Sequence, residues 1–144
     1  MNNTDIDALS GRELDLTVAL FNGYSWYAVE PDLCIVRRDT ELMHPAWKRI
    51  NPEDAIRAGD FDTYVPHYSV DISAAWELDG EGWRWEFEEH YKIVESPLVW
   101  ARCFMPEDVY TGEARFSDFP TKASAYAVAR CRAWLKAKTA EAHR

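Results

Sequence analysis

The chain has 144 residues, of which 47% are hydrophobic and 14% aromatic, and its net charge is −9. This length and composition predict a single folded domain over residues 1–144 that buries a core. No apolar run approaches the roughly 20 residues of a membrane-spanning helix, and the polar N-terminus lacks the order of a secretory signal. We therefore expect a cytoplasmic protein without membrane contacts.

The charge is unevenly distributed along the chain. Residues 53–89 hold eleven acidic side chains against two arginines, whereas the last 25 residues hold six basic side chains against Glu141. A field of this sign repels phosphates, so direct contact with nucleic acid is disfavoured. The acidic stretch favours a basic protein partner, or else it serves solubility alone.

The N-terminal third predicts a helix and a hairpin. Ser10, followed three residues later by Glu13, predicts a capping box at the start of a helix over residues 11–22. Gly23 is a natural stop for this helix. Residues 24–29 and 33–37 are rich in aromatic and β-branched side chains and predict a β-hairpin.

Residues 38–66 carry three prolines and a glycine that interrupt any long element. We expect a loop-rich excursion with one helical turn near residues 52–55. A second helix follows, with Ser69 as its N-cap and Asp71 in its first turn, where the helix dipole favours an anion. Asp79 and Gly80 end it.

The C-terminal half predicts a sheet and a long helix. Aromatic and polar residues alternate over residues 83–91, which predicts a strand with one buried and one solvated face. Further strands are expected over 98–105 and 114–119, the latter after a turn at Thr111–Gly112. Thr121 precedes a helix over residues 122–138. Its apolar stripe comprises Ala123, Ala127, Cys131 and Trp134, and its basic residues, Arg130 included, occupy the other faces. This order predicts an α+β domain in which helices pack on an antiparallel sheet.

Motifs for chemistry are weak. The sequence has no Cys/His spacing typical of zinc, no glycine-rich phosphate loop and no nucleophile elbow. His67 with Asp71, or Glu86 with Glu88, supplies acid–base groups for a small hydrolase. A helix start and a solvated strand face explain these residues more simply, so we expect no catalytic residue, no metal site and no cofactor.

Two kinds of binding surface remain. A basic protein partner would meet the carboxylates on and before the alternating strand: Asp79, Glu81, Glu86, Glu88 and Glu89. The alternative is a pocket for an anionic nucleotide signal, lined by His67, Tyr68, Trp76, Arg102, Arg115 and Arg130. An exposed sheet edge also offers a two-fold contact that would make a homodimer.

Three segments in order resemble a family of small phage and prophage proteins called the phage ABA-sandwich domain. They are Arg12-Glu13-Leu14-Asp15, the stretch from Pro66 to Leu78, and the alanine-rich stretch from Ala123 to Leu135. The resemblance implies a three-layer α/β/α sandwich and an accessory phage gene, and it carries over no activity and no catalytic residue. It leads us to expect a non-enzymatic protein of the host cytoplasm that interferes with antiviral defence by stoichiometric binding. The partner would be a host protein, such as an immune effector or a nucleic-acid-binding protein.

Overall fold

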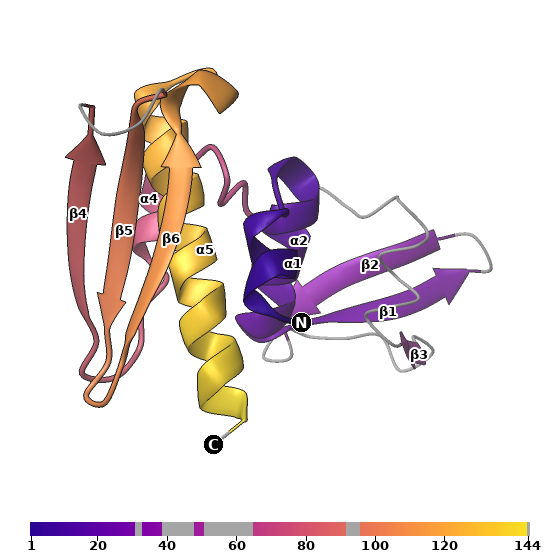
Figure 1. Cartoon of the computed structure of the whole chain (residues 1–144). Coiled ribbons are helices and arrows are strands. Elements are labelled where there is room, and N and C mark those ends of the chain that lie inside the picture. The colour runs from indigo at the N-terminus through magenta and orange to yellow at the C-terminus, as the bar shows by residue number, and fades with distance from the viewer. Residues whose placement is uncertain (31–32, 39–47, 51–64, 92–95, 144) are drawn as a thin grey trace.

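A computed structural model describes residues 1–30, 33–38, 48–50, 65–91 and 96–143 (Figure 1). Its elements in chain order are α1 (Asn3–Asp7), α2 (Gly11–Phe21), β1 (Tyr24–Glu30), β2 (Leu33–Arg38), β3 (Lys48–Ile50), α4 (Ile72–Trp76), β4 (Arg84–His90), β5 (Leu98–Phe104), β6 (Val109–Arg115), the 3-10 helix η1 (Phe116–Asp118) and α5 (Lys122–Ala142). The fold is α+β, as the sequence predicts. No helix in the described ranges has the length and apolar character to cross a membrane.

The helix predicted over residues 11–22 is confirmed as α2, and the predicted hairpin is confirmed as β1 and β2. The strand β3 is an addition to this hairpin. α2 ends just before Gly23, whose φ is +90°. Ser10 is the N-cap, but its side chain makes no capping hydrogen bond, so the predicted capping box is wrong. β1 pairs antiparallel with β2 and, along its other edge, with β3, in the order β2-β1-β3. The helical turn expected near residues 52–55 lies outside the described residues.

β4, β5 and β6 form a second antiparallel sheet in that order. The alternation along β4 is confirmed, because Trp85 and Phe87 are partly buried whereas Glu86 is exposed. The strand expected over residues 114–119 instead spans Val109–Arg115, so Thr111 and Gly112 lie within a strand and form no turn. β6 comes so close to α5 at Gly112 that a residue with a Cβ does not fit there. A Cβ at this position would lie 2.0 Å from the carbonyl oxygen of Ala129.

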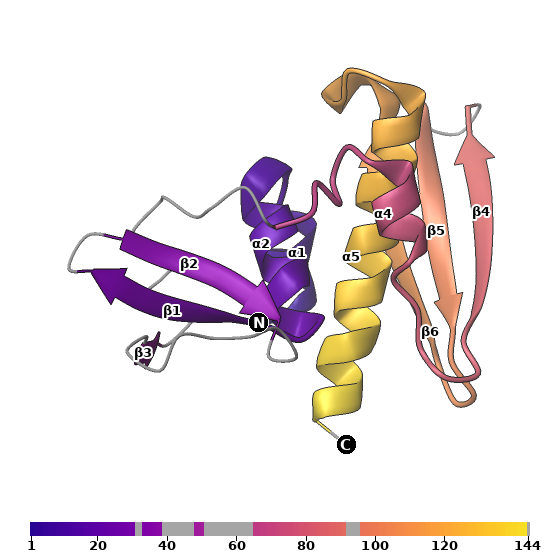
Figure 2. The same cartoon turned by 180° about the vertical axis from the view of Figure 1, so that it is seen from behind.

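α5 is the centre of the molecule. Thr121 and Ser124 form a capping box at its start, and the helix contacts β5 and β6 along one face of the sheet. α4 lies beside α5 on that same face, and α1 and α2 pack against α5 (Figures 1 and 2). The β2-β1-β3 sheet extends from the α2 side, away from β4. These helices cover one face of the β4-β5-β6 sheet, and the three-layer arrangement is not confirmed.

The apolar stripe of α5 is confirmed in part. Ala127, Cys131 and Trp134 are fully buried, whereas Ala123 is exposed. Arg130 was expected outside this stripe, and it is nevertheless only 3% exposed, because its side chain hydrogen-bonds to α4. Its hydrogen-bond partners are backbone groups distant in the sequence.

The segment that leads into α4 is held by the motif Arg12-Glu13-Leu14-Asp15 at the start of α2. The buried carboxylate of Asp15 accepts hydrogen bonds from the backbone N–H of Ser69 (2.7 Å) and from Arg12 Nη1 (3.0 Å). Arg12 also donates to the carbonyl of Val65 (3.1 Å). Asp71, and not Ser69 as expected, is the N-cap of α4. The motif residues thus act as caps and packing groups.

Candidate binding face

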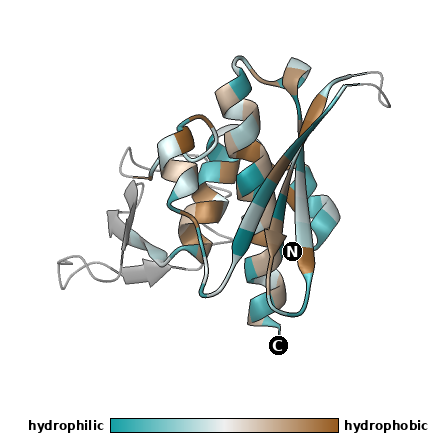
Figure 3. Cartoon of the chain, turned by 90° about the vertical axis from the view of Figure 1, so that its left-hand side faces the viewer, coloured by the Kyte–Doolittle hydropathy of each residue, from teal (hydrophilic) through white to brown (hydrophobic). Residues whose placement is uncertain are grey.

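The side chains of the β4-β5-β6 sheet that point away from α5 form a surface that we call the outer face. Figure 3 turns the β4 side toward the viewer and shows hydrophilic and hydrophobic residues alternating along the strands. The polar and aromatic members of the outer face are Arg84, Glu86, Glu88, His90, Trp100, Arg102, Phe104, Thr111, Glu113 and Arg115. The period of two along each strand places them on one side.

Acidic and basic groups alternate on this face. Glu86 lies 3.3 Å from Arg84 Nη1, and Glu88 lies 3.1 Å from Arg102 Nη1. Both glutamate side chains remain half exposed, at 50% and 51%. Ion pairs this exposed contribute little to stability, so the carboxylates can exchange these partners for others.

Trp100 lies at the centre of the outer face and is partly exposed. The His90 ring lies 3.9 Å from its ring centroid, and the guanidinium of Arg102 lies 5.1 Å from it. Trp100 Nε1 donates to a carboxylate oxygen of Glu113 (3.3 Å). The indole is therefore held by contacts from all three strands.

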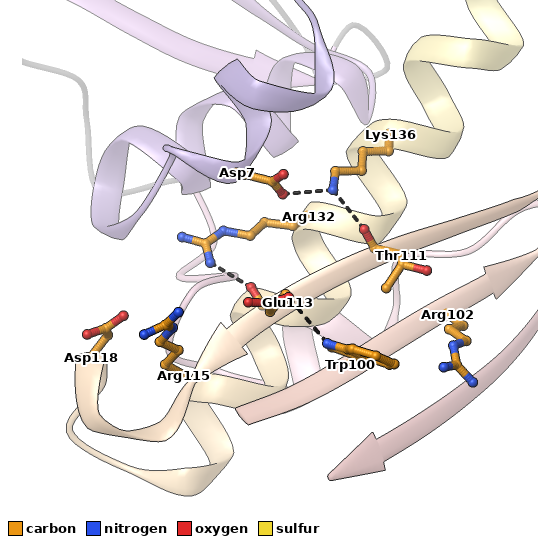
Figure 4. A pocket seen from close by; sticks show the side chains of 9 residues that line it. All are labelled: Asp7, Trp100, Arg102, Thr111, Glu113, Arg115, Asp118, Arg132 and Lys136. Atoms are coloured by element: carbon orange, nitrogen blue, oxygen red, sulfur yellow. Dashed lines mark hydrogen bonds and ion pairs between the residues drawn. The ribbon is translucent and has the colours of Figure 1, made fainter. Parts of the chain in front are cut away.

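A pocket of about 560 Å³ opens where the outer face meets α1 and α5 (Figure 4). Its lining comprises Asp7, Trp100, Arg102, Thr111, Glu113, Arg115, Asp118, Arg132 and Lys136. Four cationic side chains against three carboxylates give this lining a formal charge of +1.

Two of these cations are fixed by the fold. Lys136 Nζ contacts Asp7 at 2.7 Å and donates to the carbonyl of Thr111 at 2.8 Å. Arg132 Nη1 donates to the carbonyl of Glu113 at 2.7 Å, while its other nitrogens donate to the carbonyl of Leu9. Burial lowers the pKa of Arg132, but a guanidinium starts from so high a pKa that Arg132 stays protonated at neutral pH.

Family models, curated proteins and solved structures give no match for this chain. The chemistry of the outer face therefore rests on the residues just described.

The structure brings together only two of the five predicted acidic residues. Glu86 and Glu88 share the outer face, whereas Glu89 points to the opposite face, toward α5. Asp79 lies before β4 on the α4 side, where it accepts a hydrogen bond from Trp85 Nε1 (3.2 Å). Glu81 is exposed in the turn that follows. The expected single acidic surface is thus divided between two faces.

Glu89 has its own set of donors. Lys122 Nζ lies 2.7 Å from one carboxylate oxygen, to which the hydroxyl of Tyr126 also donates at 2.6 Å. The hydroxyl of Tyr91 donates to the other oxygen at 2.9 Å. These hydrogen bonds, that of Lys122 foremost, lower the pKa of Glu89 to about 2. Burial and the bond to Glu89 raise the pKa of Tyr126 to about 12.

The predicted nucleotide pocket is also divided. Arg102 and Arg115 line the observed pocket. Arg130 instead lies under α4, with its guanidinium 3.9 Å from the Trp85 ring centroid and 4.8 Å from that of Trp76.

The remaining predicted pocket residues belong to the α4 region. Tyr68 is 2% exposed, and its hydroxyl accepts a hydrogen bond from Asn22 Nδ2 (3.2 Å). His67 is exposed outside the pocket, and Trp76, at 42% exposure, stacks on Phe87.

Seven of the nine pocket residues were missed from the sequence, among them Trp100, Arg132 and Lys136. The spacing of two between Trp100 and Arg102 places both on one strand face and is the sequence signal for Trp100. Arg132 and Lys136 are four apart on α5 and so share a helical face. That spacing is the sequence signal for the cationic side of the pocket.

Asp71, considered above as an acid–base group, has a structural role, and the two buried cysteines are protonated. Asp71 accepts from the backbone N–H of Ser73 (2.9 Å) and of Ala74 (3.3 Å) as the cap of α4. Burial raises the pKa of the Cys103 thiol to about 12 and raises that of Cys131 as well, so neither is a thiolate at neutral pH. The described ranges contain no cluster of three or more His, Cys, Asp or Glu that could hold a metal ion.

Proposed function

We propose that the protein acts without catalysis, by stoichiometric binding of a protein partner at the outer face. The observation that supports this proposal is the composition of that face in the described part of the chain. It carries the partly exposed Trp100 among half-exposed carboxylates, and α4 and α5 cover only the opposite face. Tryptophan and arginine are the side chains that most often dominate protein interfaces.

Charge indicates the chemistry of the partner. The chain carries −9 overall, and residues 77–90 hold six acidic side chains against Arg84. A basic partner surface is drawn to such a segment, and the attraction raises the rate of association. The resemblance to the phage ABA-sandwich domain adds the expectation that this partner is a host protein, such as a nucleic-acid-binding immune effector.

Native mass spectrometry of the tagged chain, recovered from a bacterial lysate, tests the proposal. We expect a stoichiometric protein complex that Glu86→Lys and Trp100→Ala both weaken. Glu141→Lys is the matched control, because it makes the same charge change at the far end of α5 and should leave the complex intact. Binding that survives both outer-face substitutions would contradict the proposal.

The pocket supports a second candidate function, the sequestration of an anionic nucleotide. Four cationic side chains surround the pocket beside the Trp100 ring, which can stack on a base. We expect thermal stabilisation of the wild type by a cyclic nucleotide or by ADP-ribose, and its loss in Arg115→Glu. Arg84→Glu makes the same charge change on β4, outside the pocket, and should keep the stabilisation. Equal shifts for both variants, or none for the wild type, would exclude the pocket.

A further inference from the structure

The two edge strands of the β4-β5-β6 sheet differ in how their backbone groups are satisfied. On β6, Lys136 donates to the carbonyl of Thr111 and Arg132 donates to that of Glu113. Side chains from α5 thus occupy carbonyls that would otherwise be open along this edge. Covering an edge in this way prevents another strand from adding to it.

The β6 contacts also show which residues of β4 face outward. In an antiparallel sheet, both backbone groups of a residue point to the same side, and this side alternates along the strand. Thr111 and Glu113 point away from β5, so the residues between them bond to β5. Gly112 therefore bonds to Ala101 of β5, whose backbone groups point toward β6 and away from β4. Because Phe87 of β4 pairs with Ala101, the backbone groups of Phe87 point away from β5. The same holds for Trp85 and Glu89, which are two residues from Phe87 on the same strand.

The β4 edge is open in the part of the chain that the structure describes. No hydrogen bond from another described element reaches the backbone groups of Trp85, Phe87 or Glu89. β4 lies at one margin of the molecule, opposite the β2-β1-β3 sheet (Figures 1 and 2). A seven-residue strand with an open edge can pair with a further strand.

We propose that the β4 edge binds an extended segment of a basic protein partner, which adds to the sheet as a fourth strand. This inference rests on the proposed function and specifies how the partner binds. Side chains on one side of the added strand would lie beside Glu86 and Glu88, which favours lysine or arginine there. Side chains on the other side would lie beside Trp85 and Phe87, which favours apolar residues.

The aromatic side of β4 supports the apolar half of this pattern. Trp76 is 42% exposed and stacks on Phe87 with the ring centroids 4.7 Å apart. The ring centroid of Trp85 lies 6.5 Å from that of Phe87, so the three rings form a row on this side of β4. An added strand would cover this row and remove part of the exposed Trp76 ring from water.

Charge makes a second copy of this chain the poorer occupant of the edge. In a two-fold pairing centred on Phe87, Glu86 of each copy would face Glu88 of the other, and like charges directly opposite are destabilising. Each copy would also contribute the acidic segment of residues 77–90 to the contact. In a strand that alternates lysine with apolar residues, the lysines are instead attracted to Glu86 and Glu88.

Amide hydrogen exchange followed by NMR on the full chain tests the open edge. In the free protein we expect fast exchange at Trp85, Phe87 and Glu89, and slow exchange at Glu86 and Glu88. A nine-residue peptide of alternating lysine and valine is the probe. It should bind and slow exchange at the three outward amides, without slowing exchange at Thr111 or Glu113.

Variants and peptide analogues separate pairing from simple attraction. Glu86→Lys should weaken peptide binding about tenfold, whereas Glu141→Lys makes the same charge change near the end of α5, away from the edge, and should change it little. The peptide methylated at every backbone nitrogen keeps its side chains but has no backbone N–H donors, so it should not bind. A glutamate–valine peptide should not bind either.

Four outcomes would overturn the proposal. The first is slow exchange at Trp85, Phe87 and Glu89 in the free monomer, because the edge would then be covered. The second is self-association that protects these amides, because the occupant would then be a second copy. The third is no binding of the lysine–valine peptide, or equal binding of its N-methylated analogue. The fourth is charge-dependent peptide binding that leaves the three amides exchanging fast, which rejects strand addition but leaves the proposed function intact.

Discussion

At the scale of single residues, Glu89 couples the stability of the fold to pH. Its donors lower its pKa from 4.5 to about 2 in the folded chain, so the stabilisation is complete above pH 4.5 and is lost as pH falls toward 2. We expect Glu89→Gln to lower the free energy of unfolding at pH 7, and its difference from wild type to shrink between pH 4.5 and 2. Urea unfolding at pH 7, 5 and 3 measures this, with Glu86→Gln on the outer face as control. A difference that stays constant with pH would contradict the coupling.

Arg130 is the second residue with a defined structural role. Its guanidinium donates to the carbonyls of Ala75 (2.9 Å), Trp76 (3.2 Å) and Leu78 (2.6 Å) at the end of α4. Arg130→Met fills similar space but leaves these carbonyls without their donor, so we expect a loss of about 3 kcal/mol in unfolding free energy. Arg130→Lys should recover little, because one ammonium does not reproduce the planar set of donors.

The control for Arg130 is Arg102→Met, which removes a partly exposed guanidinium from the outer face. This substitution should lower the free energy of unfolding by less than about 0.5 kcal/mol. Urea unfolding curves of the three variants give both comparisons. Equal effects of Arg130→Met and Arg102→Met would show that the buried contacts do not hold α4.

At the scale of elements, the contact between β6 and α5 depends on one missing side chain. A Cβ on Gly112 would lie 2.0 Å from the carbonyl oxygen of Ala129 and 2.5 Å from the backbone nitrogen of Ala133. Both atoms are backbone, so β6 and α5 would have to separate. We expect Gly112→Ala to destabilise the fold by at least about 2 kcal/mol. Thr111→Ala, on the outer face of the same strand, should have a small effect in the same thermal melts. Similar melting temperatures for both variants would reject this close packing.

Elements defined by local pattern were predictable from the sequence, and those defined by distant contacts were not. The alternation through β4 and the capped helix α5 are properties of consecutive residues, so the sequence predicts both closely. Gly112 was assigned to a turn because glycine favours turns, whereas its actual role is to let α5 approach β6. Nothing near Gly112 in the sequence indicates which helix it faces.

At the scale of the whole molecule, the same distinction separates what could be predicted of the candidate site. Strand alternation places Glu86 and Glu88 together on the outer face, and it also places Glu89 on the opposite face of the sheet. The pocket beside β6 joins residues of α1, β5, β6, η1 and α5, so no local pattern shows it. The burial of Arg130 could not be predicted, because the carbonyls that bind it lie in and just after α4, more than 50 residues earlier in the chain.

The two sheets pack against the helices to different extents, and this difference leads to a prediction about how the chain opens. α5 packs against β5, β6 and three helices, whereas β1, beyond its own sheet, makes its main contact with α2. An element with fewer tertiary contacts opens at a lower free energy than the core. We expect the amides of Tyr24–Glu30 to exchange with an opening free energy at least about 2 kcal/mol below that of Leu98–Phe104. Mass spectrometry of exchanged peptides at rising urea concentration measures both values, with the middle of α5 as the core reference. Equal opening free energies would mean that the β2-β1-β3 sheet unfolds only with the core, as one cooperative unit over the described chain.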